Sequence, residues 1–203
     1  MIDNWYDLKV GQFKKLMALP EGEDEDRYWK VLAILNDTTV DDIMSRPLLE
    51  VSAMRKKADF LNEYPKVPAS KHKYQLGDTT YIFTDHIGDI CVAQYVDFTN
   101  LPEGAENISD VMCVVLVPDG HKYNDGYSMD KVKEDVDKYL SFMDARAMSG
   151  FFLGSFILSL DSQRRSLKKM IRKARKMGLD TDEAERSLES LNGTLRSLGY
   201  SVR

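Results

Sequence analysis

The sequence predicts a mainly α-helical protein: a multi-helix domain with one small β-hairpin, followed by a C-terminal helical hairpin. Three observations lead to this prediction. Apolar side chains recur at helical spacings through most of the 203 residues, one Gly-Asp pair lies between two short β-prone runs, and a basic amphipathic segment precedes leucines in alternating steps of four and three. With 43% hydrophobic and 30% charged residues, the chain can form one compact domain, or a domain with an appendage.

The first helices are indicated by apolar periodicity and by their ends. Residues 7–19 carry apolar side chains at mostly helical spacings, and Pro20 with Gly22 ends the pattern. Five acids within residues 21–26 then precede an apolar face over residues 28–35, as suits the positive end of a helix dipole. This acidic cluster could hold a divalent cation, but we favour a solvated helix start.

Two more helices follow before residue 62. Thr38 or Thr39 with the acids after it is typical of a cap for a short helix that reaches Met44. Pro47 then opens a longer helix that continues through Leu61. The apolar positions of these small helices need a common core.

A β-hairpin is predicted near residues 71–84. Two β-prone runs flank Gly77-Asp78, which is a hairpin signal. The side chains expected to pack are Tyr74, Leu76, Tyr81 and Phe83. Because a two-stranded hairpin is marginal by itself, it must lie on helices or pair with another chain, which would make it an assembly edge.

The middle of the chain contains two apolar segments. Ile87 to Phe98 has helical spacing, and Ile108 to Val117 is a nearly continuous apolar run that fits a buried helix or a buried strand. We favour a helix because Ser109 and Asp110 suit a helix N-terminus. Residues 118–127 then carry two turn signals and form a structured loop.

The remaining segments predict a helix that begins at Ser128 and a central core helix over residues 142–160. We therefore expect a helical domain over residues 1–160. Residues 161–203 are expected to form a separate hairpin of a basic helix and an amphipathic helix. Gly178 ends the first of these helices, and Asp180 with Glu183 offers a capping box for the second.

Charge is distributed unevenly along the chain. Residues 1–160 hold 17 basic and 27 acidic side chains, residues 161–177 hold eight basic and one acidic, and residues 178–203 hold three basic and five acidic. The net charge of −5 hides the +7 of the basic segment. The side chains expected to contact phosphate or an acidic partner are Arg164, Arg165, Lys168, Lys169, Arg172, Lys173 and Lys176.

Two interpretations of this basic face stay open. It contacts phosphate, with an affinity that depends on salt, or it is a solvated face or one docked on an acidic protein surface. No aromatic side chain interleaves with the cations, so single-strand stacking is not supported. The segment also lacks the Trp or Phe typical of a membrane-surface helix.

Nothing in the sequence indicates catalysis, a metal site or a cofactor. His72, His86 and His121 lie in separate predicted loops without ligand spacing, and no nucleotide-binding or hydrolase motif is present. A carboxylate pair assembled in space, for example from Asp85, Asp89 and Asp125, would be the remaining route, but such acids are usually solvated or capping. The sequence therefore predicts a protein that is not an enzyme.

The compartment is predicted from cysteines and apolar runs. Two cysteines suit burial in a reducing environment rather than a disulfide framework. The start of the chain has no signal-peptide pattern, and the longest apolar run, residues 150–160, covers about half a bilayer. We expect a soluble chain made in the cytoplasm.

Three pieces of the sequence carry a family resemblance: Trp5-Tyr6-Asp7-Leu8 with Gln12-Phe13; Trp29-Lys-Val-Leu-Ala-Ile-Leu35 with Thr39-Val-Asp-Asp-Ile43 and Pro47-Leu48; and Val117-Pro-Asp-Gly-His-Lys-Tyr-Asn-Asp-Gly-Tyr127 with Gly150-Phe-Phe-Leu153. They resemble small proteins encoded in the structural-gene modules of tailed bacteriophages, particularly phages of gut Bacteroidetes, including crAss-like phages. The similarity covers roughly residues 3–160, and the Pro-x-Gly-x-x-Tyr-x-x-Gly-Tyr loop is its most specific piece.

The resemblance implies a non-enzymatic virion protein, made in the host bacterial cytoplasm and packed inside the capsid or in the portal and tail lumen. Its partners would be portal, tail or capsid proteins, with packaged DNA against the basic helix; an oligomer would also fit. The resemblance alternatively implies a tail-assembly chaperone that is absent from the finished particle. Within the loop, Tyr123, Asn124 and Tyr127 are candidates for partner contact. Alternatively, the loop residues have only a structural role, in which the glycines form tight turns and the tyrosines pack beneath them.

A third hypothesis is a sequence-nonspecific DNA-binding accessory protein that reads phosphates only through the basic helix. It predicts binding that weakens steeply with salt and does not distinguish sequences.

Overall fold

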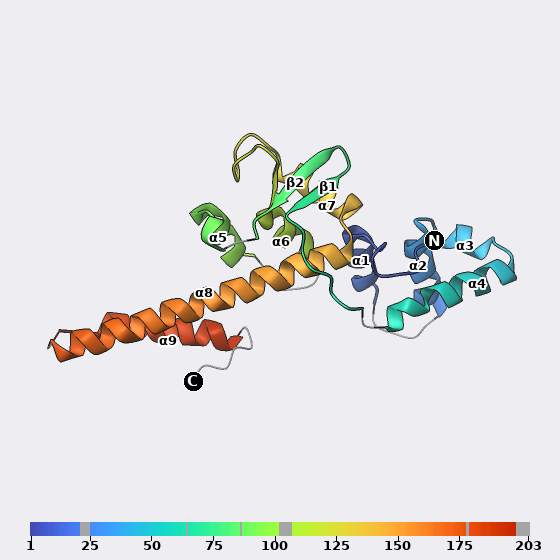
Figure 1. The fold of residues 1–203 in the computed structure, drawn as a ribbon. Coiled ribbons are helices and arrows are strands. Elements are labelled where there is room, and N and C mark those ends of the chain that lie inside the picture. The colour runs from blue at the N-terminus through green and yellow to red at the C-terminus, as the bar shows by residue number, and fades with distance from the viewer. Residues whose placement is uncertain (21–24, 64, 86, 102–106, 178, 198–203) are drawn as a thin grey trace. The chain divides into compact units, whose positions relative to one another are not determined.

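The structure is a computed structural model that describes residues 1–20, 25–63, 65–85, 87–101, 107–177 and 179–197. It is mainly α-helical with a small antiparallel sheet, which confirms the predicted fold class (Figure 1). The chain divides into two compact units, Met1–Asp85 with Asp89–Ser149 and His86–Gly88 with Gly150–Arg203. The division between Ser149 and Gly150 lies within one long helix, eleven residues before the boundary that we expected from the sequence.

The N-terminal part of the first unit contains the predicted small helices. They are α1 (Val10–Met17), α2 (Glu25–Asn36), α3 (Val40–Met44) and α4 (Leu48–Ala58), which a 3₁₀ turn, η1 (Asp59–Asn62), continues. The first helix begins later than residue 7 because the Asn4 side chain accepts hydrogen bonds from the backbone N–H groups of Tyr6 and Asp7 at 2.9 and 3.1 Å. Such local bonds hold a turn in competition with a helix.

Of the two threonines offered as a cap for α3, Thr39 is the N-cap. Its hydroxyl accepts a hydrogen bond from the Asp42 N–H at 3.2 Å, and the Asp42 carboxylate accepts one from the Thr39 N–H. The Thr38 hydroxyl also donates to the Asp42 carboxylate, at 2.6 Å. Hydrogen bonds from Thr38 and Thr39 hold the pKa of Asp42 below its ordinary value.

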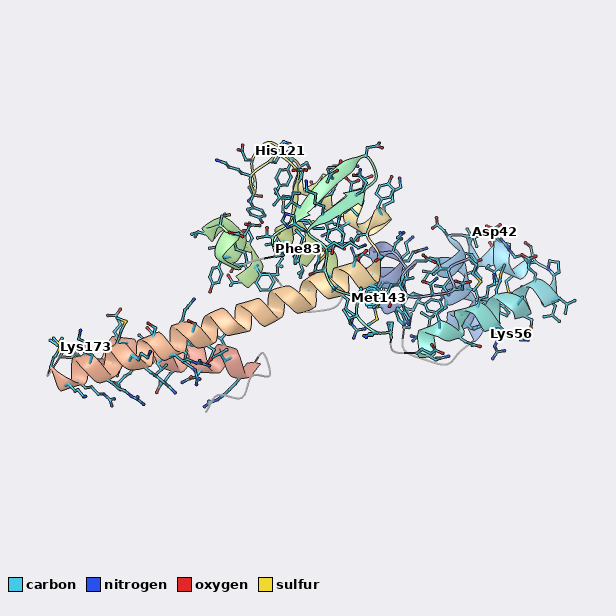
Figure 2. The ribbon with its side chains drawn as sticks, in the orientation of Figure 1. Asp42, Lys56, Phe83, His121, Met143 and Lys173 are labelled. Atoms are coloured by element: carbon cyan, nitrogen blue, oxygen red, sulfur yellow. The ribbon has the colours of Figure 1, made fainter. Side chains whose placement is uncertain are left out.

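Two buried clusters hold these helices together. The first joins α2, α3 and α4 and consists of Leu32, Ala33, Ile43, Val51 and Met54. The second consists of Leu8, Leu35, Phe142 and Met143. The second cluster ties the start of the chain to residues 142 and 143, where the long helix begins, and Figure 2 labels Met143 at this place.

The predicted hairpin is present and forms part of a three-stranded sheet. Strands β1 (Lys73–Leu76) and β2 (Thr79–Phe83) pair across a turn in which Gly77 has a φ of 58°. The predicted packing residues Tyr74, Leu76, Tyr81 and Phe83 are all buried. Helix α7 (Met129–Tyr139) lies on this side of the sheet, because the Tyr81 hydroxyl donates to the Asp135 carboxylate of α7 at 2.8 Å.

The third strand comes from the end of the apolar run for which we favoured a helix. The run is helical as α6 (Ile108–Val115), but Leu116 leaves helical geometry and begins β3 (Leu116–Pro118). This strand pairs antiparallel with β2, so the order is β1-β2-β3. The helix prediction was therefore wrong for Leu116 and Val117, since pairing with β2 satisfies their backbone groups instead.

The segment from Ile87 to Phe98 is not one helix. A 3₁₀ turn, η2 (Ile87–Asp89), is followed by α5 (Val92–Thr99), and Cys91 is the N-cap of α5. Its sulfur accepts a hydrogen bond from the Gln94 N–H at 3.5 Å, and Cys91 is exposed, whereas Cys113 is buried. Burial raises the pKa of the Cys113 thiol to about 12.

Candidate functional site

The basic segment lies on the C-terminal part of the longest helix. Helix α8 (Phe142–Lys176) contains both the predicted core helix and the predicted basic helix as one element, and α9 (Asp182–Ser197) runs back beside its far end (Figure 1). Arg175 on α8 pairs with Glu185 on α9 at 2.8 Å. The turn between them is not the predicted capping box: the Asp180 carboxylate accepts from the Asp182 N–H at 2.9 Å.

Asp161 neutralises the first two cations of the segment. Its carboxylate contacts the Arg164 guanidinium at 2.7 Å and the Arg165 guanidinium at 2.5 Å, at the i+3 and i+4 positions of the helix. Asp161 and Arg164 are both buried, with exposed fractions of 2% and 8%. Arg164 is thus part of the packed surface of the hairpin, and it does not belong to the exposed cations.

The remaining cations of the segment form an exposed stripe. At 3.6 residues per turn, Arg165, Lys169, Arg172 and Lys176 share one face of α8, and the exposed Lys173 is next to it. The stripe is about 16 Å long at 1.5 Å per residue. Figure 2 labels Lys173 on this part of α8. Lys168 is only partly exposed.

Among the described residues, none forms an ion pair with Lys169, Arg172, Lys173 or Lys176. Of the other cations of the segment, Arg164 and Arg165 pair with Asp161, Arg175 pairs with Glu185, and Lys168 also has an interaction partner, which distinguishes them from these four. We call these four side chains the open cations. They concentrate positive charge on a surface that the rest of the hairpin does not neutralise.

The ion pairs of Asp161 predict a pH dependence of the hairpin. Burial disfavours the charged carboxylate, but hydrogen bonds and charge from Arg164 and Arg165 outweigh it, so the pKa of Asp161 lies below its ordinary value of 3.8. The stabilisation is complete above that ordinary value and is lost as the pH falls through the folded pKa. In hydrogen exchange over residues 161–177 and 179–197, Asp161→Asn should reduce protection at pH 7, and the difference should be smaller at an acidic pH below 3.8. An equal difference at both pH values would contradict this.

The loop over residues 118–127 is structured, as expected. Gly120 and Gly126 have φ values of 85° and 76°, which favour glycine, and Asn124 is also left-handed at 58°. The Tyr123 hydroxyl donates to the Asp97 carboxylate of α5 at 2.7 Å, and the Tyr127 hydroxyl accepts from the Asn124 N–H at 3.3 Å. Burial raises the pKa of both phenols.

Of the three loop residues offered for partner contact, only Asn124 is thus exposed. Tyr123 and Tyr127 are partly buried and hold the loop together. The side chain of His121 contacts the Asp125 carbonyl oxygen at 3.1 Å and lies at the tip of the loop in Figure 2.

The acids considered for catalysis have separate surroundings. Asp85 pairs with His72 at 3.4 Å, and both side chains are about half exposed. Asp89 is the last residue of η2, and the Asp125 N–H donates to the Lys122 carbonyl oxygen within the loop at 3.0 Å. In the part of the chain that the structure describes, no group of three His, Cys, Asp or Glu residues could hold a metal ion.

A cavity of about 740 Å³ in the first unit lies along α1 and α7. Lys14 reaches from α1 to the Asp137 carboxylate of α7 at 2.9 Å and to the Ser109 hydroxyl at 3.0 Å. Ser109 is fully buried and hydrogen-bonded to Asp137, so this serine cannot meet a substrate. The network joins α1, α6 and α7 and is structural.

Comparisons with protein-family models, with curated proteins and with solved structures find no match to this chain. Among the described helices, none is long and apolar enough to cross a membrane.

Proposed function

We propose that the chain is a non-enzymatic protein of a tailed-bacteriophage particle that contacts packaged double-stranded DNA through the open cations of α8. The observation that carries the DNA contact is that Lys169, Arg172, Lys173 and Lys176 are exposed and lack ion-pair partners among the described residues. Arg164, Arg165 and Arg175, in contrast, pair with Asp161 or Glu185. The resemblance to phage structural-module proteins supports a location in the phage particle. The neighbours of the chain there would be portal, tail or capsid proteins.

The chemistry of the stripe favours phosphate over base recognition. Lysine and arginine contact phosphates without reading sequence, and each neutralised phosphate releases counterions, so binding depends steeply on salt. The stripe offers no aromatic side chain on which an unpaired base could stack. Duplex DNA, whose phosphates are regularly spaced, is therefore the nucleic acid that the stripe fits best.

The test is charge reversal of the four open cations to glutamate. At low salt, we expect the affinity for a random-sequence DNA duplex to fall by about two orders of magnitude, and the slope of log affinity against log salt to fall by about three to four. Fluorescence anisotropy across a salt series measures both. The matched control reverses four exposed lysines of the first unit, Lys30, Lys56, Lys57 and Lys66, and so makes the same change in net charge. Figure 2 labels Lys56 on α4.

Equal losses in the two variants would refute a specific role for the open cations. Whether the chain is located in the phage particle is tested separately, by mass spectrometry of purified, nuclease-treated phage. Presence of the chain at stoichiometric level supports a virion protein. Absence, with expression during infection, would overturn the virion assignment in favour of an assembly chaperone or, if the DNA result holds, of a cytosolic DNA-binding accessory protein.

A further inference from the structure

The β1 strand has one edge that no other strand covers. The Phe83 N–H donates to the His72 carbonyl at 2.9 Å, and in an antiparallel ladder such hydrogen-bonded pairs alternate along the strand. Tyr74 and Leu76 therefore bond to β2, whereas the N–H and C=O groups of Lys73 and Gln75 point away from it. Among the described residues, no hydrogen bond reaches these outward backbone groups.

A groove of about 420 Å³ runs along this edge. All four residues of β1 line it on one side. The opposite side includes Lys9 and Ser141, which form a short antiparallel bridge, with Val10 N–H bonded to the Leu140 carbonyl at 3.0 Å. The Phe142 N–H also bonds to the Leu8 carbonyl at 2.7 Å, and the Lys9 N–H bonds to the Gln12 side chain at 3.1 Å, so these backbone groups do not compete for the β1 edge.

The groove ends near the hairpin turn. Tyr139, the last residue of α7, also lines the groove, and its ring lies so close to Gly77 that a Cβ there would be 2.8 Å from it. The groove is therefore bounded by the bridge along its side and by an aromatic ring at the turn.

The exposed backbone groups define what could bind in the groove. Alternating N–H and C=O groups along an edge are matched by another extended strand. Three lysines line the groove, Lys9, Lys71 and Lys73, against one acid, Asp144. Lys71 lies 3.6 Å from Asp144, Lys73 pairs with Asp119 at 3.0 Å, and no ion pair of Lys9 occurs among the described residues. The excess of positive charge favours acidic side chains on the bound segment.

We propose that the β1 edge binds an extended, acidic segment of a partner protein by strand addition, with Lys73 and Gln75 making the backbone hydrogen bonds. This interaction uses the first unit and is independent of the DNA contact proposed for α8.

The test compares two substitutions at one position. Gln75→Pro removes the outward N–H, at a place where an edge strand tolerates proline because its ladder to β2 uses Tyr74 and Leu76. Gln75→Ala keeps the N–H but loses the same side-chain bonds, to Thr80 at 2.7 Å and to the Gly77 carbonyl at 2.8 Å. The difference between the two variants therefore isolates the backbone group.

The probe is a displayed library of random twelve-residue peptides selected on the wild-type chain. We expect enrichment of peptides with acidic residues, whose affinity falls about tenfold more with Gln75→Pro than with Gln75→Ala. Lys9→Glu should weaken the same peptides, whereas Lys57→Glu on α4 should not. Amide exchange in the free wild-type chain should show the Lys73 and Gln75 amides unprotected and the Phe83 amide protected. The Phe83 amide should also be protected in Gln75→Pro. Binding of the selected peptide to the wild type should protect the Lys73 and Gln75 amides.

Three results would overturn the proposal. The first is a selection that enriches no peptide for the wild type over Gln75→Pro. The second is a set of peptides that bind the proline and alanine variants equally. The third is protection of the Lys73 and Gln75 amides in the free chain, which would mean that the edge is already paired.

Discussion

Phe142→Ala should destabilise the first unit by about 3–5 kcal/mol, the usual cost of removing a buried phenylalanine. The Phe142 ring stacks on Phe13 with centroids 3.8 Å apart and lies 5.7 Å from the ring of Trp5, and the residue belongs to the cluster with Leu8 and Met143. Removing the ring leaves a cavity where the start of the chain meets the start of α8. Since small domains are stable by only about 5–15 kcal/mol, the loss should be readily measured.

The measurement is urea unfolding followed by tryptophan fluorescence. Both tryptophans of the chain, Trp5 and Trp29, lie in the first unit, so the signal reports that unit and not the hairpin. The control is Leu49→Ala on α4, where the leucine is 86% exposed and its loss should change the free energy of unfolding by less than about 0.5 kcal/mol. Similar losses in both variants would show that the cluster around Phe142 is not a core.

The fold class followed from the sequence because its helices have strong local signals. Thr39 with Asp42, Pro47 and Ser128 mark helix starts, and the Gly77-Asp78 pair marks the turn of the hairpin. Each of these signals acts within four residues. They depend little on the rest of the chain, so a pattern read along the sequence finds them.

The third strand could not be found in this way. Leu116 and Val117 continue an apolar run that helix and strand both fit. They become a strand because β2, more than thirty residues earlier, offers its free edge, and Phe83 pairs with Leu116. Tertiary pairing determines the secondary structure of such a segment, and local propensity along the chain does not indicate that pairing.

The sequence analysis did not predict how the cations of the basic segment pair with acids. The sequence located the basic face on residues 161–177, and the structure separates Arg164 and Arg165 from the open cations through their pairs with Asp161. The spacing Asp-x-x-Arg-Arg is a helical ion-pair signal that could have indicated this. The groove beside β1 had no such signal, because Lys9, Lys71 and Tyr139 meet there only through the fold.

The second large effect concerns a buried polar contact beneath the sheet. Tyr81 and Asp135 are 1% and 3% exposed, their side chains are 2.8 Å apart, and Lys131 holds the other carboxylate oxygen at 2.7 Å. Asp135→Ala should cost about 1–3 kcal/mol because the Tyr81 hydroxyl loses its buried acceptor. Tyr81→Phe should cost a similar amount, and the double variant should cost less than the sum, by about 0.5–3 kcal/mol. Additive losses would show that the two groups do not interact.

The same contact predicts how stability responds to alkali. Burial, and then the hydrogen bond to the Asp135 carboxylate and its charge, raise the pKa of Tyr81 well above the ordinary value of 10.0. A raised pKa contributes stability that is complete below the ordinary value and is lost as the pH rises towards the folded pKa, because only the unfolded chain ionises there. Wild type should therefore lose stability above about pH 10, measured by tryptophan fluorescence in urea, and Tyr81→Phe should lose less over the same range. The other tyrosines whose pKa burial raises remain in the variant and account for the loss that persists: Tyr28, Tyr74, Tyr123 and Tyr127. If wild type and variant responded identically, the Tyr81 phenol would be as free to ionise in the folded chain as in the unfolded one, and the double-variant coupling should then be absent too.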